Sequence, residues 1–275
     1  MLDSLLLPFH NDFMQRALLA SIAVSAVCAV VGVFVVQRGL AFLGDGLAHA
    51  AFGGIAIGLF LGAGLDNAVW IAIPFTALIA VGIGFILRRT NLRGDVATGV
   101  FFSFSFALGV VFLKLRKGGP AVELETLLFG NVLTITPTVL TVVLAVAAIG
   151  LVLTILLWSR TAYALFDPEL ARISGVNVAA LEYLLLAQTA VIVVVAVKCV
   201  GVVLVSSFLV IPAAASRLLG SSLARATVIA TSIGVIGAVV GLWASFYLNT
   251  SAYAVIILLY SAVFGIALVV SRLRR

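Results

Sequence analysis

Long apolar runs follow one another along the chain, and short polar segments that hold most of its arginines separate them. Runs of about 20 apolar residues predict membrane-spanning helices, since a helix of that length crosses the hydrocarbon core of a bilayer. The strict alternation typical of membrane β-barrels does not occur. The run at 200–216 is short, so it is either a full span or a re-entrant half-span, which leaves nine or eight spans. The predicted spans lie near 14–36, 41–62, 67–87, 95–115, 133–158, 178–197, 200–216, 223–247 and 252–271.

Composition indicates the same class of protein. Hydrophobic residues make up 64% of the chain and charged residues 9%, and the mean hydropathy is +1.33. So little polar surface cannot coat a soluble globule. We therefore expect an all-α, polytopic transmembrane helix bundle in which residues 1–275 form a single transmembrane domain. The two cysteines, Cys28 and Cys199, lie in apolar runs without a CxxC partner, so we expect small buried core residues.

The basic residues predict the orientation of the bundle. With nine spans and the N-terminus outside, one side holds eleven of the sixteen lysines and arginines, as the positive-inside rule expects. We therefore expect a multi-pass protein of a prokaryotic cell membrane, with the C-terminus in the cytoplasm. No basic cluster is interleaved with aromatics, so no nucleic-acid partner is expected. The eleven are Arg38, Arg88, Arg89, Arg93, Arg160, Arg172, Arg217, Arg225, Arg272, Arg274 and Arg275.

A pair of ionisable residues, Asp45 and His49, lies in an otherwise apolar stretch. Four residues apart, they stack on one face of a helix. A charged Asp inside a membrane costs about 2.5 to 3.5 kcal/mol, so it needs a partner, an aqueous path or a proton. Carboxylate and imidazole together suit Zn²⁺ or Mn²⁺, and two ligands from one chain fit a weak transit site.

A purely structural alternative stays open for this pair. Asp45, after Gly44, would cap its helix, and His49 would be hydrogen-bonded inside the bundle. Among the other ionisable residues, Asp95 is expected to be an N-cap and Glu182 an interfacial anchor, and neither is assigned to an ion path.

Small residues repeat at four-residue steps on the neighbouring face of the same predicted helix. Such a stripe lets another helix approach closely in a membrane. The repeat consists of Gly46, Ala50, Gly54 and Gly58.

The connection after the fifth span has the complete pattern of a two-turn helix. It offers an N-cap Asp, Pro at the first helical position, Glu in the first turn and Gly just past the end. So short a helix does not hold itself in water. It therefore needs either the surface of the bundle or a docked protein. Its residues are Asp167, Pro168, Glu169, Leu170, Ala171, Arg172, Ile173, Ser174 and Gly175.

Pro212 interrupts the apolar segment at 200–216 and frees a backbone carbonyl. Ser206, Ser207 and Ser216 are placed either to satisfy this carbonyl or to contact a neighbour. The segment is either a kinked packing helix or a moving gate element.

Five segments, 13–19, 32–50, 129–133, 166–176 and 202–217, together resemble the permease subunit of the zinc/manganese class of ATP-binding cassette importers. The Gly-Asp-x-x-x-His-Ala element at 44–50 and the Ile-Pro-Ala-Ala-x-x-Arg element at 211–217 are specific in combination.

The resemblance implies a homodimer that takes zinc, manganese or iron from an extracytoplasmic metal-binding protein, with cytoplasmic ATPase subunits driving transport. It also implies that Asp45 and His49 are similar to metal ligands of the translocation path, and that 167–175 is similar to the coupling helix that meets the ATPase. No permanently bound cofactor is implied.

The chain contains no GxxxxGK[ST] loop, so ATP hydrolysis is expected in a partner and the chain is not expected to be an enzyme. Neither HExxH nor Gly-x-Ser-x-Gly occurs, which disfavours an intramembrane hydrolase. Two alternatives remain: an ATP-independent cation transporter or channel, and a permease for a metal chelate such as a siderophore.

Overall fold

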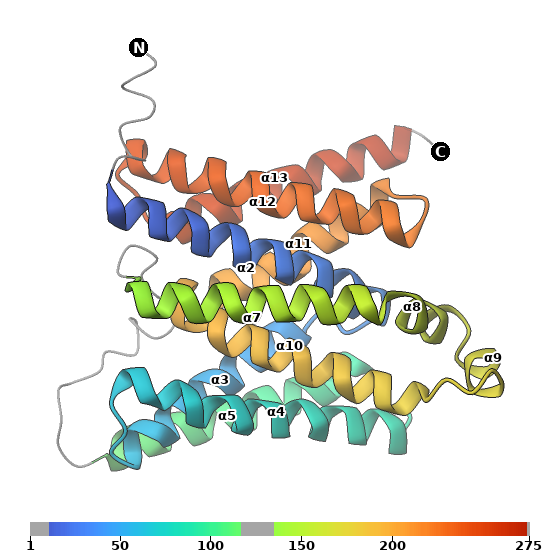
Figure 1. Ribbon diagram of the computed structural model, residues 1–275, viewed down its shortest axis with the longest axis horizontal. Helices are drawn as coiled ribbons and strands as arrows, with labels where there is room; N and C mark the ends of the chain where they lie inside the picture. Colours follow the sequence, from blue (N-terminus) through green and yellow to red (C-terminus); the bar gives the residue numbers. More distant parts are fainter. Residues whose placement is uncertain (1–10, 117–134, 274–275) are drawn as a thin grey trace.

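The computed structural model describes residues 11–116 and 135–273, and within these ranges the chain is a bundle of long helices lying side by side (Figure 1). The predicted all-α membrane bundle is confirmed, since nine helices of the described ranges are long and apolar enough to cross a bilayer. The helices are α2 (Asp12–Gln37), α3 (Leu43–Phe60), α4 (Leu65–Arg89), α5 (Gly94–Leu115), α7 (Pro137–Leu156), α8 (Trp158–Phe166), α9 (Pro168–Ile173), α10 (Val178–Val200), α11 (Val202–Leu219), α12 (Leu223–Leu248) and α13 (Ala252–Leu273).

The predicted spans agree with these helices to within a few residues, and two places differ. The predicted span 133–158 ends earlier, at Leu156, and a separate helix, α8, follows it at once. The short segment 200–216 is an 18-residue helix, α11, of spanning length, which favours nine spans over eight within the described ranges. Gly201 alone joins α10 to α11, with a φ of +83° that favours glycine.

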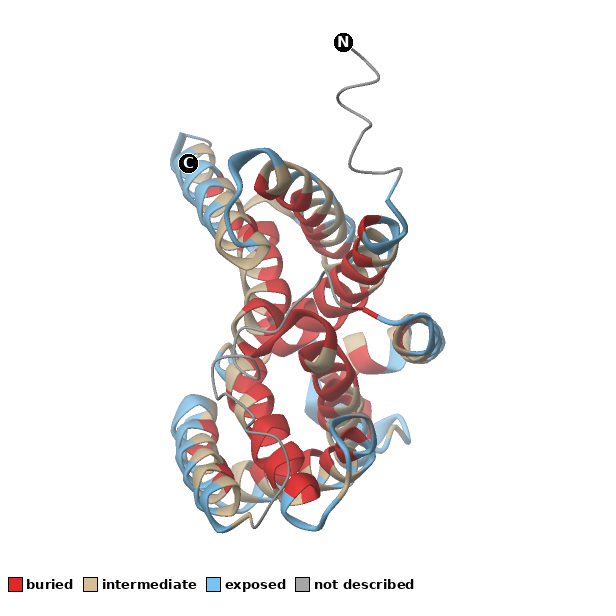
Figure 2. Cartoon of the chain, turned by 90° about the vertical axis from the view of Figure 1, so that its left-hand side faces the viewer, coloured by how far each residue is buried: buried red, intermediate tan, exposed pale blue. Residues whose placement is uncertain are grey.

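Burial divides the bundle into central and peripheral helices. Helices α2, α3 and α10 are buried along most of their length, whereas α5, α7 and α13 bury only a narrow stripe (Figure 2). The exposed sides of the peripheral helices carry large apolar residues such as Ile149, Leu258 and Ile266. Such a surface suits contact with lipid rather than water. Cys28 and Cys199 are free and buried in the core, as expected.

The small-residue stripe of α3 makes the close helix contact predicted from its spacing. A Cβ atom added at Gly54 would lie 2.6 Å from the Cα of Ala72, and one added at Gly58 would lie 2.9 Å from the Cα of Ala68. Both alanines belong to α4, so the two helices touch backbone to backbone. The contact fixes α3, and with it the ionisable pair, firmly within the bundle.

The short helix predicted after the fifth span exists as α9, and its ends are built as the sequence indicates. The Asp167 carboxylate accepts a hydrogen bond of 2.9 Å from the amide of Leu170, and Pro168 occupies the first helical position. At the other end Gly175 adopts a φ of +80°, and the amide of Val176 donates to the carbonyl of Ala171. This is a Schellman cap, which closes the helix after its second turn.

The predicted N-cap role of Asp95 is wrong. Helix α5 begins one residue earlier, at Gly94, with Arg93 as its N-cap. Asp95 lies in the first turn, where its negative charge still complements the helix dipole.

Candidate functional site

Asp45 and His49 lie on the first two turns of α3, close to the turn that joins α2 to α3. The Asp45 side chain is 42% exposed and that of His49 is 16% exposed. The N-cap of α3 is Phe42, so Asp45 is not the helix cap, and this part of the alternative interpretation is wrong. Asp45 lies in the first turn of α3, where its negative charge complements the helix dipole, and its side chain is partly exposed.

The His49 ring is held by the backbone of its own helix. Its Nδ1 lies 3.0 Å from the main-chain oxygen of Asp45 and 3.7 Å from the Asp45 carboxylate. With Nδ1 donating its proton to the carbonyl, the lone pair of the neutral ring is at Nε2. A backbone hydrogen bond that fixes the tautomer in this way is typical of histidines that bind metals. The other part of the alternative, a His49 hydrogen-bonded within the bundle, therefore agrees with a ligand role.

Two phenylalanines of α5 complete the surroundings of His49. The ring centroids of Phe102 and Phe106 lie 4.4 Å and 5.5 Å from that of the imidazole, and both contacts are edge-on. Their spacing of four residues puts both rings on one face of α5. Packing of this kind restricts the rotation of the imidazole, which sequence reasoning did not anticipate.

A pocket of about 280 Å³ opens beside Asp45 between α3 and α11. Asp45 supplies the carboxylate, and Ser206 and Ser207 supply two hydroxyl groups from α11. Both hydroxyls donate to the main-chain oxygen of Val203, at 3.0 Å each, so their lone pairs remain to accept hydrogen bonds from water. The remaining lining is apolar, from Ala41, Phe42, Val210 and Ile211.

Of the two roles expected for the serines of α11, the structure does not show the first, and Ser206 and Ser207 instead line the pocket shared with α3. Ser206 and Ser207 donate to Val203, and Ser216 donates to the carbonyl of Ala213 at 2.8 Å. None of them satisfies the carbonyl freed by Pro212, which is that of the residue four positions earlier. Pro212 itself is buried inside a continuous helix, so α11 is not broken there. Whether it is a kink or a gate stays a prediction.

Each chain offers an incomplete set of metal ligands. Within the described ranges, no group of three or more His, Cys, Asp or Glu residues is close enough to hold one ion. Two side chains from one chain leave most coordination positions to water or to further groups. This arrangement suits an ion that enters and leaves, rather than one that stays bound.

Helix α9 lies with α8 at the end of the bundle opposite to the start of α2, called the α9 end (Figure 1). Ala171 of α9 is buried against Ala164 of α8 and Leu181 of α10. The opposite side presents Leu170 and Ile173, exposed by 49% and 83%. Of the two supports that the sequence left open, the bundle holds one face of α9, and the other face is uncovered.

Comparison with known proteins places the chain in a family. Residues 10–271 match the ABC 3 transport family. The chain is 33% identical over 256 residues to the manganese transport system membrane protein MntC of Listeria monocytogenes, covering 93% of this chain and 90% of that protein. It is 32% identical over 269 residues to the chelated iron transport system membrane protein YfeD of Yersinia pestis, covering 97% and 88%.

A solved structure extends the comparison to three dimensions. The chain resembles PsaBC from Streptococcus pneumoniae in complex with Fab, with a TM-score of 0.84 and 29% identity, over 97% of this chain and 95% of that chain. The resemblance drawn from the sequence motifs is thereby confirmed. The protein is a multi-pass membrane permease subunit that belongs to the ABC 3 transport family.

Proposed function

We propose that the chain forms the translocation path of an ATP-driven importer for a divalent first-row metal ion, and that the ion passes Asp45 and His49. The observation that carries the proposal is the partly exposed Asp45 carboxylate, in a spanning helix, one turn from an imidazole held by its Nδ1 atom. A carboxylate and a histidine nitrogen suit Mn²⁺, Fe²⁺ and Zn²⁺. Manganese is the first expectation, because relatives such as MntC are named for it.

A second copy of the chain would complete the path. The Asp45 pocket opens on the surface of the single chain, where an ionised carboxylate facing lipid would be costly. A homodimer that faces its two pockets toward each other removes this contact and doubles the number of ligands. We expect four protein ligands in the pore, two from each copy.

The uncovered face of α9 is the proposed contact with a cytoplasmic ATPase subunit. Leu170 and Ile173 offer apolar anchors, and the neighbouring Glu169 and Arg172 are also exposed. Exposed apolar side chains rimmed by charges are typical of protein contact sites. The chain lacks a nucleotide-binding loop of its own, so the energy of ATP would enter through this contact.

The proposed orientation puts the α9 end in the cytoplasm. An extracytoplasmic metal-binding protein would then deliver the ion at the opposite end. The orientation rests on the excess of positive charge in the connections at the α9 end. The described basic residues there are Arg38, Arg88, Arg89, Arg93, Arg160, Arg172, Arg217, Arg225 and Arg272.

A metal chelate is the second candidate cargo, since YfeD is named for chelated iron. The residues at the site favour a free divalent ion, because the Asp45 carboxylate and the His49 imidazole can bind the ion directly. A chelate brings its own metal ligands and does not specifically require this pair.

Uptake by proteoliposomes that contain the chain and its ATPase tests the proposal. We expect ATP-dependent uptake of Mn²⁺ by the wild type, and at least about a 100-fold loss in Asp45→Asn and His49→Ala with assembly unchanged. Normal uptake by either variant would reject the site. Uptake without ATP would favour a channel, and uptake of a ferric siderophore but not of free Mn²⁺ would favour the chelate.

A further inference from the structure

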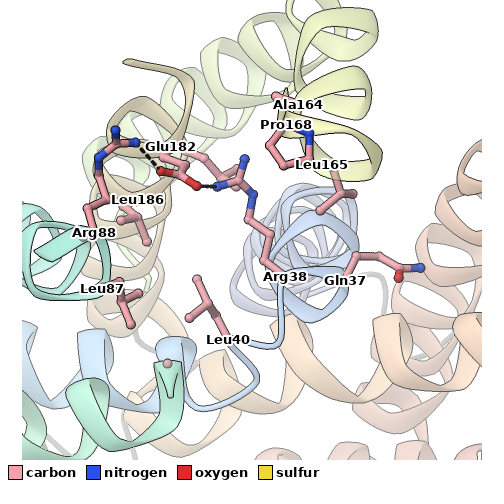
Figure 3. Close-up of a pocket in the computed structure, with 13 residues that line it drawn as sticks. Gln37, Arg38, Leu40, Leu87, Arg88, Ala164, Leu165, Pro168, Glu182 and Leu186 are labelled. Carbon is pink, nitrogen blue, oxygen red and sulfur yellow. Dashed lines mark hydrogen bonds and ion pairs between the residues drawn. The ribbon is translucent and has the colours of Figure 1, made fainter. Parts of the chain in front are cut away.

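An ion-pair bridge joins three helices at the α9 end (Figure 3). One carboxylate oxygen of Glu182 lies 2.8 Å from Nη1 of Arg38, and the other lies 2.8 Å from Nη1 of Arg88. Arg38 follows the last residue of α2, Arg88 lies in the last turn of α4, and Glu182 lies on the second turn of α10. This arrangement, called the Glu182 bridge, adds two ion-pair partners to the expectation that Glu182 is an interfacial anchor.

Close packing of α4 against α10 and a helix cap at Arg38 hold the residues of the Glu182 bridge in place. A Cβ atom added at Gly84 would lie 2.7 Å from Leu186, so α4 and α10 touch one turn away from the bridge. The two helices are antiparallel, and one turn from this contact Arg88 meets Glu182. Arg38 is fixed by a Schellman cap, in which the amide of Leu40 donates to the carbonyl of Val35 at 3.1 Å.

The bridge is partly buried, and Arg38 is its most buried member. The side chains of Arg38 and Glu182 are 12% and 30% exposed. Nε and Nη2 of Arg38 are buried and have no hydrogen-bond partner among the described residues. Burial lowers the pKa of the Arg38 guanidinium, and the Glu182 carboxylate opposes that shift. Removing one partner from a partly buried ion pair leaves the other charge uncompensated, so the loss of Glu182 would free both arginines.

The Glu182 bridge lies at the edge of a pocket, so its side chains have room to move. A pocket of about 460 Å³ is lined by Arg38, Arg88 and Glu182. Ala164 of α8 and Pro168 of α9 line the same pocket. The short helix that faces the proposed ATPase therefore lies directly beside the bridge.

Two backbone hydrogen bonds connect α9 to the start of α10: the amide of Val176 donates to Ala171 and that of Val178 donates to Val176, both at 2.9 Å. Ala171 of α9 packs with Val178 and Leu181 of α10, and Glu182 is the next residue. The amide of Ala180 donates to the Asn177 side chain at 3.0 Å, which caps α10. A displacement of α9 therefore moves the first turns of α10 with it.

An equally short path leads from the bridge to the ionisable pair. Six residues, 39–44, lie between Arg38 and Asp45, and they form the turn after α2 and the start of α3. Within it, the amide of Leu43 donates to Leu40 at 3.0 Å, and that of Gly46 donates to Phe42 at 2.9 Å. Leu40 is buried, so the turn is anchored in the core. Movement of Arg38 is thereby passed to the first turn of α3.

We infer that Glu182 is a positioning residue of the transport cycle: by holding Arg38 and Arg88, it couples displacement of α9 to the turn that carries Asp45. This inference rests on the proposed role of α9 as the ATPase contact. In the observed state the bridge ties the ends of α2, α4 and α10 together. When α9 is displaced, Glu182 separates from one or both arginines, and the start of α3 is released.

Two measurements on Glu182→Gln test the inference. On the purified chain alone, hydrogen exchange of the amides of residues 38–46 should rise about tenfold, as expected for loss of charge-assisted hydrogen bonds. In proteoliposomes with the ATPase and Mn²⁺, the variant should keep ATPase binding and ATP hydrolysis but move about tenfold fewer ions per ATP. A residue that only packs would leave the ratio of ions to ATP unchanged.

Neighbouring arginines supply a matched control. Arg88→Gln should reproduce both effects, whereas Arg89→Gln should not, because Arg89 lies over the Phe85 ring instead of bonding Glu182. If Glu182→Gln does not assemble, Glu182→Asp keeps the charge but is too short to reach both guanidinium groups, and it should lower the ratio partially. Wild-type exchange and coupling in either Glu182 variant, or equal effects of the Arg88 and Arg89 variants, would overturn the inference. If the wild-type complex moves no Mn²⁺, the proposed importer function is rejected instead. Hydrogen exchange in the isolated chain then still tests whether Glu182 is linked to residues 38–46.

Discussion

Replacement of Asp167 by alanine removes the cap of α9 without touching the rest of the bundle. The carboxylate accepts one hydrogen bond of 2.9 Å, from the amide of Leu170. Helix α9 has six residues, and its other described supports are the buried Ala171, the closing Schellman turn and a 3.1 Å hydrogen bond between Tyr163 and Ser174. The cap is therefore a large part of what holds this helix.

The size of the effect follows from the energy of one cap. Loss of an N-cap side chain costs about 1 kcal/mol, with a range of roughly 0.5 to 2 kcal/mol. An energy of 1 kcal/mol changes an equilibrium constant about fivefold. Hydrogen exchange of the Leu170 amide should therefore be about fivefold faster in Asp167→Ala. If the ATPase binds only the folded helix, its dissociation constant should rise by up to about the same factor.

The assay pairs hydrogen exchange by mass spectrometry with titration of the ATPase onto the chain in nanodiscs. Asp167→Asn is the control, because its side-chain oxygen also caps helices and both readings should stay near wild type. Equal exchange in Asp167→Ala and the wild type would refute the cap as a support of α9. Faster exchange with unchanged ATPase affinity would show that α9 stays mostly folded in Asp167→Ala, whereas a larger loss of affinity than of helix stability would refute the cap as the sole cause.

Three further predictions concern packing, α11 and orientation. Gly54→Ala should destabilise the bundle by about 1 to 3 kcal/mol in thermal unfolding, because the new Cβ meets α4. The control Gly265→Ala should not destabilise it, because a Cβ there enters open space. Equal effects of the two substitutions would contradict the contact between α3 and α4. Pro212→Ala restores a backbone donor in an unbroken helix, so Mn²⁺ uptake should stay within about twofold of wild type. Loss of uptake in an assembled complex would instead favour the gate over the kinked packing helix. Cysteine at the exposed Leu92 should react with a membrane-impermeant maleimide only from the cytoplasm, and cysteine at Leu61 only from outside; the reverse pattern would invert the topology.

Local signals account for the parts of the fold that sequence alone predicted well. Hydropathy located the spans, because every backbone group inside a bilayer must be satisfied within its own helix. The N-cap Asp167, Pro168 and the terminal Gly175 predicted α9 almost residue by residue. The spacing of Asp45 and His49 predicted their shared face in the same way.

Contacts between distant segments could not be predicted in this way. Glu182 lies 94 residues from Arg88, and nothing near either residue indicates the other. Ser206 and Ser207 share a pocket with Asp45 only because α11 packs beside α3. The i, i+4 spacing of Phe102 and Phe106 was a visible signal, but it does not say which helix those rings face. Such pairings depend on how helices assemble rather than on local pattern.

The most direct test of the central claim is pulsed electron paramagnetic resonance of Mn²⁺ bound to the assembled complex. The chain contains only two histidines, His10 and His49, so a nitrogen coupling from this chain has few sources. The account predicts an imidazole nitrogen coupling to the ion that persists in His10→Ala and disappears in His49→Ala. A coupling that survives in His49→Ala, or its absence from the wild type loaded with Mn²⁺, would contradict the claim that the ion passes His49.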